Sequence, residues 1–82
     1  MSNYTTKRVG PWGLTPAEAD TIRLVAQGMR LCEIAELKQL SDRTTESHGM
    51  KVRTKMEVKT LARAAVLFDR WEAGRQQEGG TP

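Results

Sequence analysis

Reactive side chains are few in this chain of 82 residues. There is one histidine, His48, and one cysteine, Cys32. A nucleophile and its base must lie within hydrogen-bonding reach, and we expect these two residues on separate helices. No glycine-rich phosphate loop follows a strand, and no Cys/His set has the spacing of a metal site. The sequence therefore predicts no catalytic residue, no metal site and no cofactor, and an enzyme is not expected.

Positive charge is the second chemical feature, and it is concentrated in one window. The whole chain has a net charge of +3, whereas residues 51 to 63 hold five basic residues against one acid, Glu57. The basic residues are Lys51, Arg53, Lys55, Lys59 and Arg63. Such a cluster suits a polyanionic partner, although charge alone slightly favours a solvated helix face.

The cluster overlaps a predicted helix that begins after Ser41, whose hydroxyl can cap it. One face of this helix carries Thr45, His48, Val52 and Met56. The opposite face carries Arg43, Ser47, Met50, Lys51 and Thr54. A helix with a small, polar and partly basic outer face can approach the base edges of DNA while its inner face packs on neighbouring helices.

Two shorter helices precede it. Residues 15 to 18 read TPAE, in which Thr15 and Glu18 can form a capping box around a proline at the first helical position. Gly28 then provides a left-handed stop, so the first helix is predicted at about 16 to 27. A second helix, at about 31 to 38, has no good N-cap. The short turn between the second and third helices is the layout of a helix-turn-helix.

A fourth helix is predicted at about 59 to 73, where Leu61, Ala65 and Phe68 recur at helical spacing. Strand signals are absent, so the fold class is all-α with four helices. Phe68 and Trp71 are expected in the core or in a dimer seam rather than in a base-stacking platform.

The ends of the chain differ from this ordered part. Residues 1 to 13 are predicted to be a flexible arm, with Trp12 as the exception because its ring can dock on the domain; 14 to 73 form the domain, and 74 to 82 a disordered tail. The sequence contains no run of about 18 apolar residues that could span a membrane. The N-terminus has no apolar core region, so it is not expected to be a signal peptide. We expect a cytoplasmic protein without an intramolecular disulfide.

The stretch from Leu14 to about Val66 resembles the LuxR/GerE-type helix-turn-helix domain, whose pattern reads roughly LTpRE…vLrLlaqG…eIAe.L.iS..TVk.H…I..KL. The match has no gap and covers about two-thirds of the chain, and the length resembles that of stand-alone members. The matching positions are Leu14, Thr15, Pro16, Glu18, Leu24, Ala26, Gln27, Gly28, Glu33, Ile34, Ala35, Ser41, Thr44, His48, Lys55, Val58 and Ala64.

The resemblance implies a DNA-binding domain, usually dimeric, whose third helix (about 42 to 56) reads the major groove while the fourth (about 59 to 73) contributes the dimer contact. Carried over by position, the groove-facing residues are Glu46, Ser47, Met50 and Lys51. Residues near phosphates are Arg43, Thr44 and Lys55; we add Arg53 as a further phosphate contact and Thr54 on the same face. The expected dimer contact comprises Leu61, Ala64, Ala65, Phe68 and Trp71.

Several residues depart from the family pattern. Glu46 replaces the usual lysine, and it either shifts base preference, because a carboxylate can accept from cytosine N4, or abolishes binding. Thr45 replaces a valine, and its hydroxyl can bond the carbonyl one turn back. At Lys38, which replaces a leucine, either Leu37 fills the space or the lysine stem lies along the surface. Gln39 replaces a common glycine, so we expect a longer second helix.

Two functional hypotheses follow. The first is a small sequence-specific DNA-binding transcriptional regulator, a homodimer on double-stranded DNA in a bacterial or phage setting, associated with the nucleoid when bound. The alternative is a protein-interaction module that pairs with a larger related regulator or with the transcription machinery and modulates DNA binding. The acid at Glu46 and the apolar fourth helix motivate the alternative.

Overall fold

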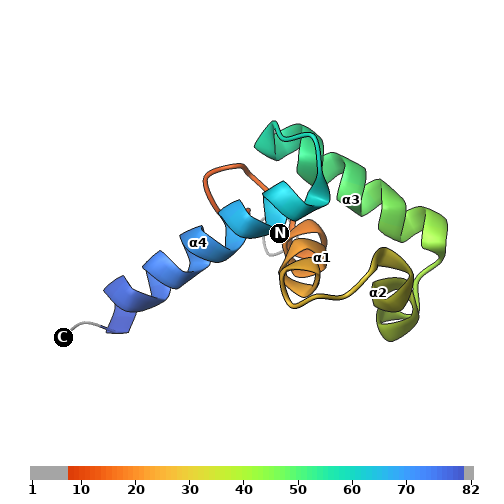
Figure 1. The fold of residues 1–82 in the computed structure, drawn as a ribbon, viewed down its shortest axis with the longest axis horizontal. Coiled ribbons are helices and arrows are strands. Elements are labelled where there is room, and N and C mark those ends of the chain that lie inside the picture. Colours follow the sequence, from red (N-terminus) through yellow and green to blue (C-terminus); the bar gives the residue numbers. More distant parts are fainter. Residues whose placement is uncertain (1–7, 81–82) are drawn as a thin grey trace, which may run out of the picture.

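The computed structural model describes the backbone of residues 8–80 and the side chains of residues 8–75. Four helices make up the fold: α1 (Pro16–Ala26), α2 (Leu31–Lys38), α3 (Asp42–Met56) and α4 (Leu61–Gly80) (Figure 1). Within the described part, extended pairing is limited to one isolated bridge between Val9 and Leu14. The all-α, four-helix fold expected from the sequence is therefore confirmed. None of the helices in residues 8–80 is long and apolar enough to cross a membrane.

The helix ends follow local chemistry. The N–H of Glu18 donates to Thr15 Oγ1 at 3.2 Å and the N–H of Thr15 donates to Glu18 Oε1 at 3.0 Å, which closes the predicted capping box. Gly28 has φ 98°, the left-handed conformation expected of it. At α3, the N–H of Thr44 donates to Ser41 Oγ at 3.0 Å.

The turn between α2 and α3 differs from the expectation. Helix α2 ends at Lys38, and Gln39 adopts φ 58° and ψ 43°, so the prediction of a longer second helix is wrong. The turn is closed by the N–H of Leu40, which donates to the carbonyl of Ala35 at 2.8 Å. Because this turn is short, α3 follows directly after α2. Gln39 adopts the left-handed conformation at the turn even though its Cβ makes that conformation unfavourable.

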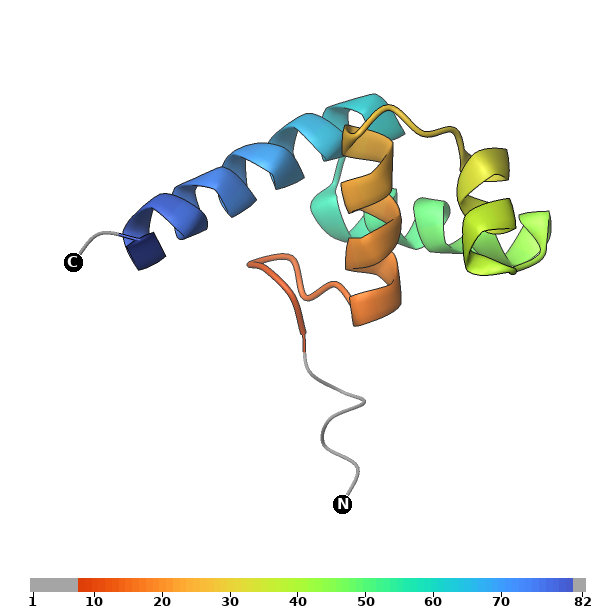
Figure 2. The ribbon, with the colours of Figure 1, turned by 90° about the horizontal axis from the view of Figure 1, so that it is seen from below.

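The core lies where α1 packs against both α3 and α4, while α2 packs mainly on α3 (Figure 2). Leu14, Ile22, Val52, Ala64 and Phe68 are completely buried there. This core, built from Leu14 and from residues of α1, α3 and α4, gives α3 a fixed position, with one side against the domain and the other in solvent.

The N-terminal segment belongs partly to this core. Residues 1–7 of the predicted arm lie outside the described residues, but residues 8–13 differ from a flexible arm. Val9 and Leu14 exchange backbone hydrogen bonds of 2.7 and 3.2 Å. The Trp12 ring lies 6.2 Å from Phe68 and 5.9 Å from Trp71 between centroids, so Trp12 docks on α4.

Helix α4 is longer than predicted. It continues to Gly80 and extends away from the other helices, whereas the sequence placed its end at 73 and a disordered tail from 74 (Figure 1). Arg75 lies over the Trp71 ring at 5.0 Å, one helical turn away. This contact and the good helix formers after Gly74 favour continuation of the helix.

Candidate nucleic-acid interface

The outer face of α3 presents polar and basic side chains to solvent. The exposed residues are Arg43, Thr44, Glu46, Ser47, Met50, Lys51 and Thr54. Met50 is 58% exposed although it is apolar. The structure thus brings these predicted residues onto one open helix face.

The inner face of α3 is packed, which fixes the orientation of the outer face. Thr45 is fully buried and its hydroxyl donates to the carbonyl of Ser41 at 3.1 Å, as expected. Gly49 is also buried, and a Cβ there would come within 3.2 Å of Leu61 Cδ1, so the missing side chain allows α4 to begin close to α3. His48 is half-buried, and its Nδ1 has no hydrogen-bond partner among the described residues.

Lys55 does not lie free for phosphate contact. Its Nζ is 2.7 Å from Oε1 of Glu18, a carboxylate that is only 3% exposed, and 3.4 Å from the carbonyl of Gly13. Burial would raise the pKa of Glu18, but the hydrogen bonds from Lys55 and from the Thr15 N–H outweigh it, and the pKa is lowered. In this structure Lys55 therefore ties α3 to α1, and its contact with phosphate stays a prediction.

Arg53 is also engaged, though less completely. Its Nη1 donates to the carbonyl of Lys59 at 3.1 Å, which braces the turn between α3 and α4. Arg53 is half-buried, whereas Lys59 and Arg63 are exposed. Both residues belong to the basic cluster of residues 51 to 63, but no separate role was predicted for either of them. Their exposure, which charge patterning does not reveal, makes them available to a partner.

The departure at Lys38 is resolved by an ion pair. Lys38 Nζ contacts the carboxylate of Asp20 on α1, and Leu37 is 60% exposed. Leu37 therefore does not fill the space. The lysine stem lies along the surface and its charge holds α2 beside α1.

Helix α2, the tight turn at Gln39 and the exposed face of α3 have the arrangement of a helix-turn-helix. Residues 13–68 match the family described as bacterial regulatory proteins, luxR family (GerE). The chain belongs to the LuxR family. The exposed face of α3 is thus part of a DNA-binding helix-turn-helix domain of a regulator. Searches among curated proteins and among solved structures found no significant match.

The dimer contact predicted for this LuxR-family chain needs correction. Ala64 and Phe68 are completely buried and Ala65 is nearly so, because they face the protomer's own core. Leu61 and Trp71 are half-buried against the same core. Apolar periodicity marks a buried face, but it does not distinguish burial within one chain from burial between two. These residues therefore stabilise the domain itself, and among them only Ala65, which is 7% exposed, also lines the groove between α4 and the end of α1.

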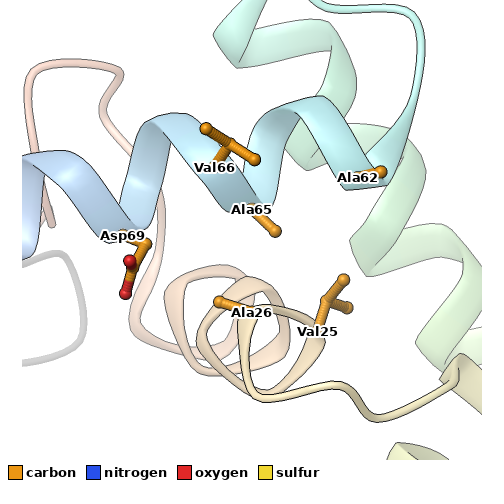
Figure 3. Close-up of a pocket in the computed structure, with 6 residues that line it drawn as sticks. All are labelled: Val25, Ala26, Ala62, Ala65, Val66 and Asp69. Carbon is orange, nitrogen blue, oxygen red and sulfur yellow. The ribbon is translucent and has the colours of Figure 1, made fainter.

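A different side of α4 is open. It forms a shallow groove of about 340 Å³ with the end of α1 (Figure 3). The groove is lined by Val25, Ala26, Ala62, Ala65, Val66 and Asp69. Val66 is 46% exposed, and most of the other side chains are small. The LuxR-family domain thus presents an apolar strip on α4 beside a carboxylate.

Proposed function

We propose that this LuxR-family protein is a sequence-specific transcriptional regulator that places α3 in the major groove and pairs with a second copy through α4. The observation that carries the proposal is the open face of α3, on which Arg43, Ser47, Met50 and Lys51 lie together. A helix of this kind fits the width of the major groove. The family's bacterial description supports action on DNA in the cytoplasm.

Base recognition is assigned to the middle of this face. Lys51 can donate to guanine O6 and N7, Glu46 can accept from cytosine N4, and Met50 can contact a thymine methyl. All three side chains are exposed. A carboxylate beside phosphates is unfavourable unless it finds this donor, so Glu46 supplies selectivity against other bases.

Phosphate contacts are assigned to Arg43 and Lys59, with the remaining donors of Arg53 and the hydroxyls of Thr44 and Thr54 in support. Arg43 and Lys59 are exposed, and among the described ion pairs neither has a carboxylate partner. Such contacts provide sequence-independent affinity and position the helix.

The second copy is assigned to the groove of Figure 3. Two antiparallel α4 helices that cross at Val66 bury their apolar strips against each other. Arg63 and Asp69 lie three residues to either side of Val66, so each then sits near the opposite charge of the second copy. An isologous contact of this kind is self-complementary, and it presents two α3 helices for half-sites about 34 Å apart.

The decisive experiment is selection of bound fragments from a random DNA pool at about 150 mM salt, where only nearby charges interact strongly. We expect a two-fold symmetric motif. Lys51→Ala should then lose about 1–3 kcal/mol of binding free energy and relax one base position. Arg75→Ala removes the same charge far from α3 and serves as the matched control. An equal loss on every sequence would make Lys51 a phosphate contact.

The dimer is tested separately by sedimentation equilibrium without DNA. Asp69→Arg places like charges together across the pair and should weaken association. The double variant Arg63→Asp/Asp69→Arg restores opposite charges and should recover it. If the double variant remains as weak as the single one, the antiparallel pairing at Val66 is wrong.

The alternative is a module that pairs with a larger related regulator and modulates its DNA binding. The favouring observation is that Asp42 and Glu46 are both exposed at the start of α3. In that case the selection enriches no motif, and binding is weak and disappears as salt rises. Val66→Glu would then abolish function while Lys51→Ala would not.

A further inference from the structure

A second recess lies between the N-terminal segment, the start of α1 and the C-terminal half of α4. Its volume is about 540 Å³, within the range of small-molecule sites. It is lined by Arg8, Val9, Gly10, Pro16, Arg23, Trp71 and Arg75. None of the predicted or proposed DNA-contacting residues lines it.

The charges around the recess are unevenly compensated. Glu72 receives hydrogen bonds of 3.1 and 2.7 Å from Arg23, and Asp20 a further bond of 3.2 Å. The hydrogen bond to Glu72, above all, raises the pKa of Arg23, and the two carboxylates compensate the positive charge that Arg23 retains. Arg8 and Arg75 form no ion pair with the side chains of residues 8–75. The recess therefore keeps two positive charges that have no compensating carboxylate in its lining.

An aromatic wall, the Trp71 ring, lines the recess together with these charges. The Trp71 ring is half-buried and is held at 5.5 Å from Phe68 and 5.9 Å from Trp12. The backbone at Gly10 lies close to it, since a Cβ there would come within 3.6 Å of Trp71. Arg75 lies over the ring at 5.0 Å. The indole is thus held in a fixed position beside the recess, with the Arg75 guanidinium over one of its faces.

We propose that this recess binds a small planar aromatic anion. Its ring packs against Trp71, and its anionic group accepts hydrogen bonds from Arg8 and Arg75. Guanidinium groups form charge-assisted, often bidentate bonds to carboxylate and phosphate, and an aromatic wall selects a flat partner. The apolar contribution of Val9 and Pro16 suits the body of the same ligand. The proposal does not depend on DNA binding.

Two sources share this chemistry: an aromatic carboxylate, and a nucleotide with its base and phosphate. The test is a titration of the isotopically labelled full chain followed by NMR, with benzoate and adenosine monophosphate as probes. We expect saturable shifts of the Trp71 indole N–H and of the Arg8 and Arg75 side chains with one of them. The probe that saturates identifies the source.

Matched controls make the result specific. Arg8→Gln and Arg75→Gln should each weaken binding by about tenfold, the loss of one charge-assisted hydrogen bond. Arg70→Gln removes an exposed charge from α4 outside the recess lining and should leave affinity unchanged. Benzamide lacks the charge and cyclohexanecarboxylate lacks the flat ring, so both should bind more weakly than benzoate.

The proposal is overturned if neither probe saturates by roughly 10 mM, tenfold above a millimolar Kd. If benzamide bound as tightly as benzoate, the recess would not require an anion. If cyclohexanecarboxylate bound as tightly as benzoate, the recess would not require a planar ring. An equal loss in Arg70→Gln and Arg75→Gln would reduce the effect to a general attraction for anions. Unchanged spectra of the variants away from the recess establish that each remains folded.

Discussion

Replacing Lys55 by methionine separates a structural role from a DNA contact. The substitution keeps the length of the stem but removes the ammonium that lies 2.7 Å from Glu18. If Lys55 ties α3 to α1, the variant loses stability. If Lys55 contacts phosphate, the variant loses DNA affinity and keeps its stability.

The magnitude follows from the surroundings of the pair. Removing one partner of a fully buried ion pair costs about 3–5 kcal/mol, because the other charge is left uncompensated. Glu18 is 3% exposed, but it retains the hydrogen bond from the Thr15 N–H, and the Lys55 side chain is 30% exposed. We therefore expect a loss nearer that of one hydrogen bond to a charged group, about 2 kcal/mol. That corresponds to about 8–16 °C in Tm for a domain of this size.

The same pair predicts a pH dependence. The pKa of Glu18 is lower in the folded protein than its ordinary value of 4.5. Its contribution to the free energy of unfolding is therefore complete above that value and is lost as the pH falls through the folded pKa. The difference between the wild type and Lys55→Met should shrink over that acidic range, because a protonated Glu18 no longer needs the ammonium.

Urea unfolding followed by tryptophan fluorescence measures the loss, at pH 7 and across the acidic range. Lys51→Met is the matched control, since it removes an equal charge from the exposed face of the same helix. It should leave stability unchanged and weaken DNA binding. A loss below about 0.5 kcal/mol in Lys55→Met, the range of ordinary surface substitutions, would refute the structural role.

Two further predictions concern the backbone and the core of the helix-turn-helix. Gln39→Gly should raise the free energy of unfolding by about 0.5–1 kcal/mol, because Gln39 has φ 58° and glycine adopts this conformation without a Cβ penalty. A lower Tm of the variant in thermal unfolding would contradict the left-handed turn. Thr45→Val should change stability by less than about 1 kcal/mol, because the Ser41 carbonyl keeps its bond from the Thr45 N–H at 3.1 Å; a larger loss in urea would show that the hydroxyl is needed.

Most residues of the candidate interface could be predicted from the helical periodicity of the sequence. Arg43, Ser47, Met50 and Lys51 share one side of any helix over residues 42 to 56, and their exposure follows once the other side is apolar. The ion pair of Lys55 could not be predicted from the sequence, because its partner Glu18 lies 37 residues away along the chain. A basic residue in a charged window looks the same whether it points to solvent or to a buried acid.

Local signals determined the helices and their ends. The caps at Thr15 and Ser41 and the left-handed stop at Gly28 act on backbone groups within a few residues. Their effect can therefore be predicted from the sequence alone. The tertiary structure decided which apolar side of α4 faces its own core, and that Trp12 closes over Phe68. Those outcomes depend on segments far apart in the chain, whose approach costs loop entropy and is decided by packing of the whole domain.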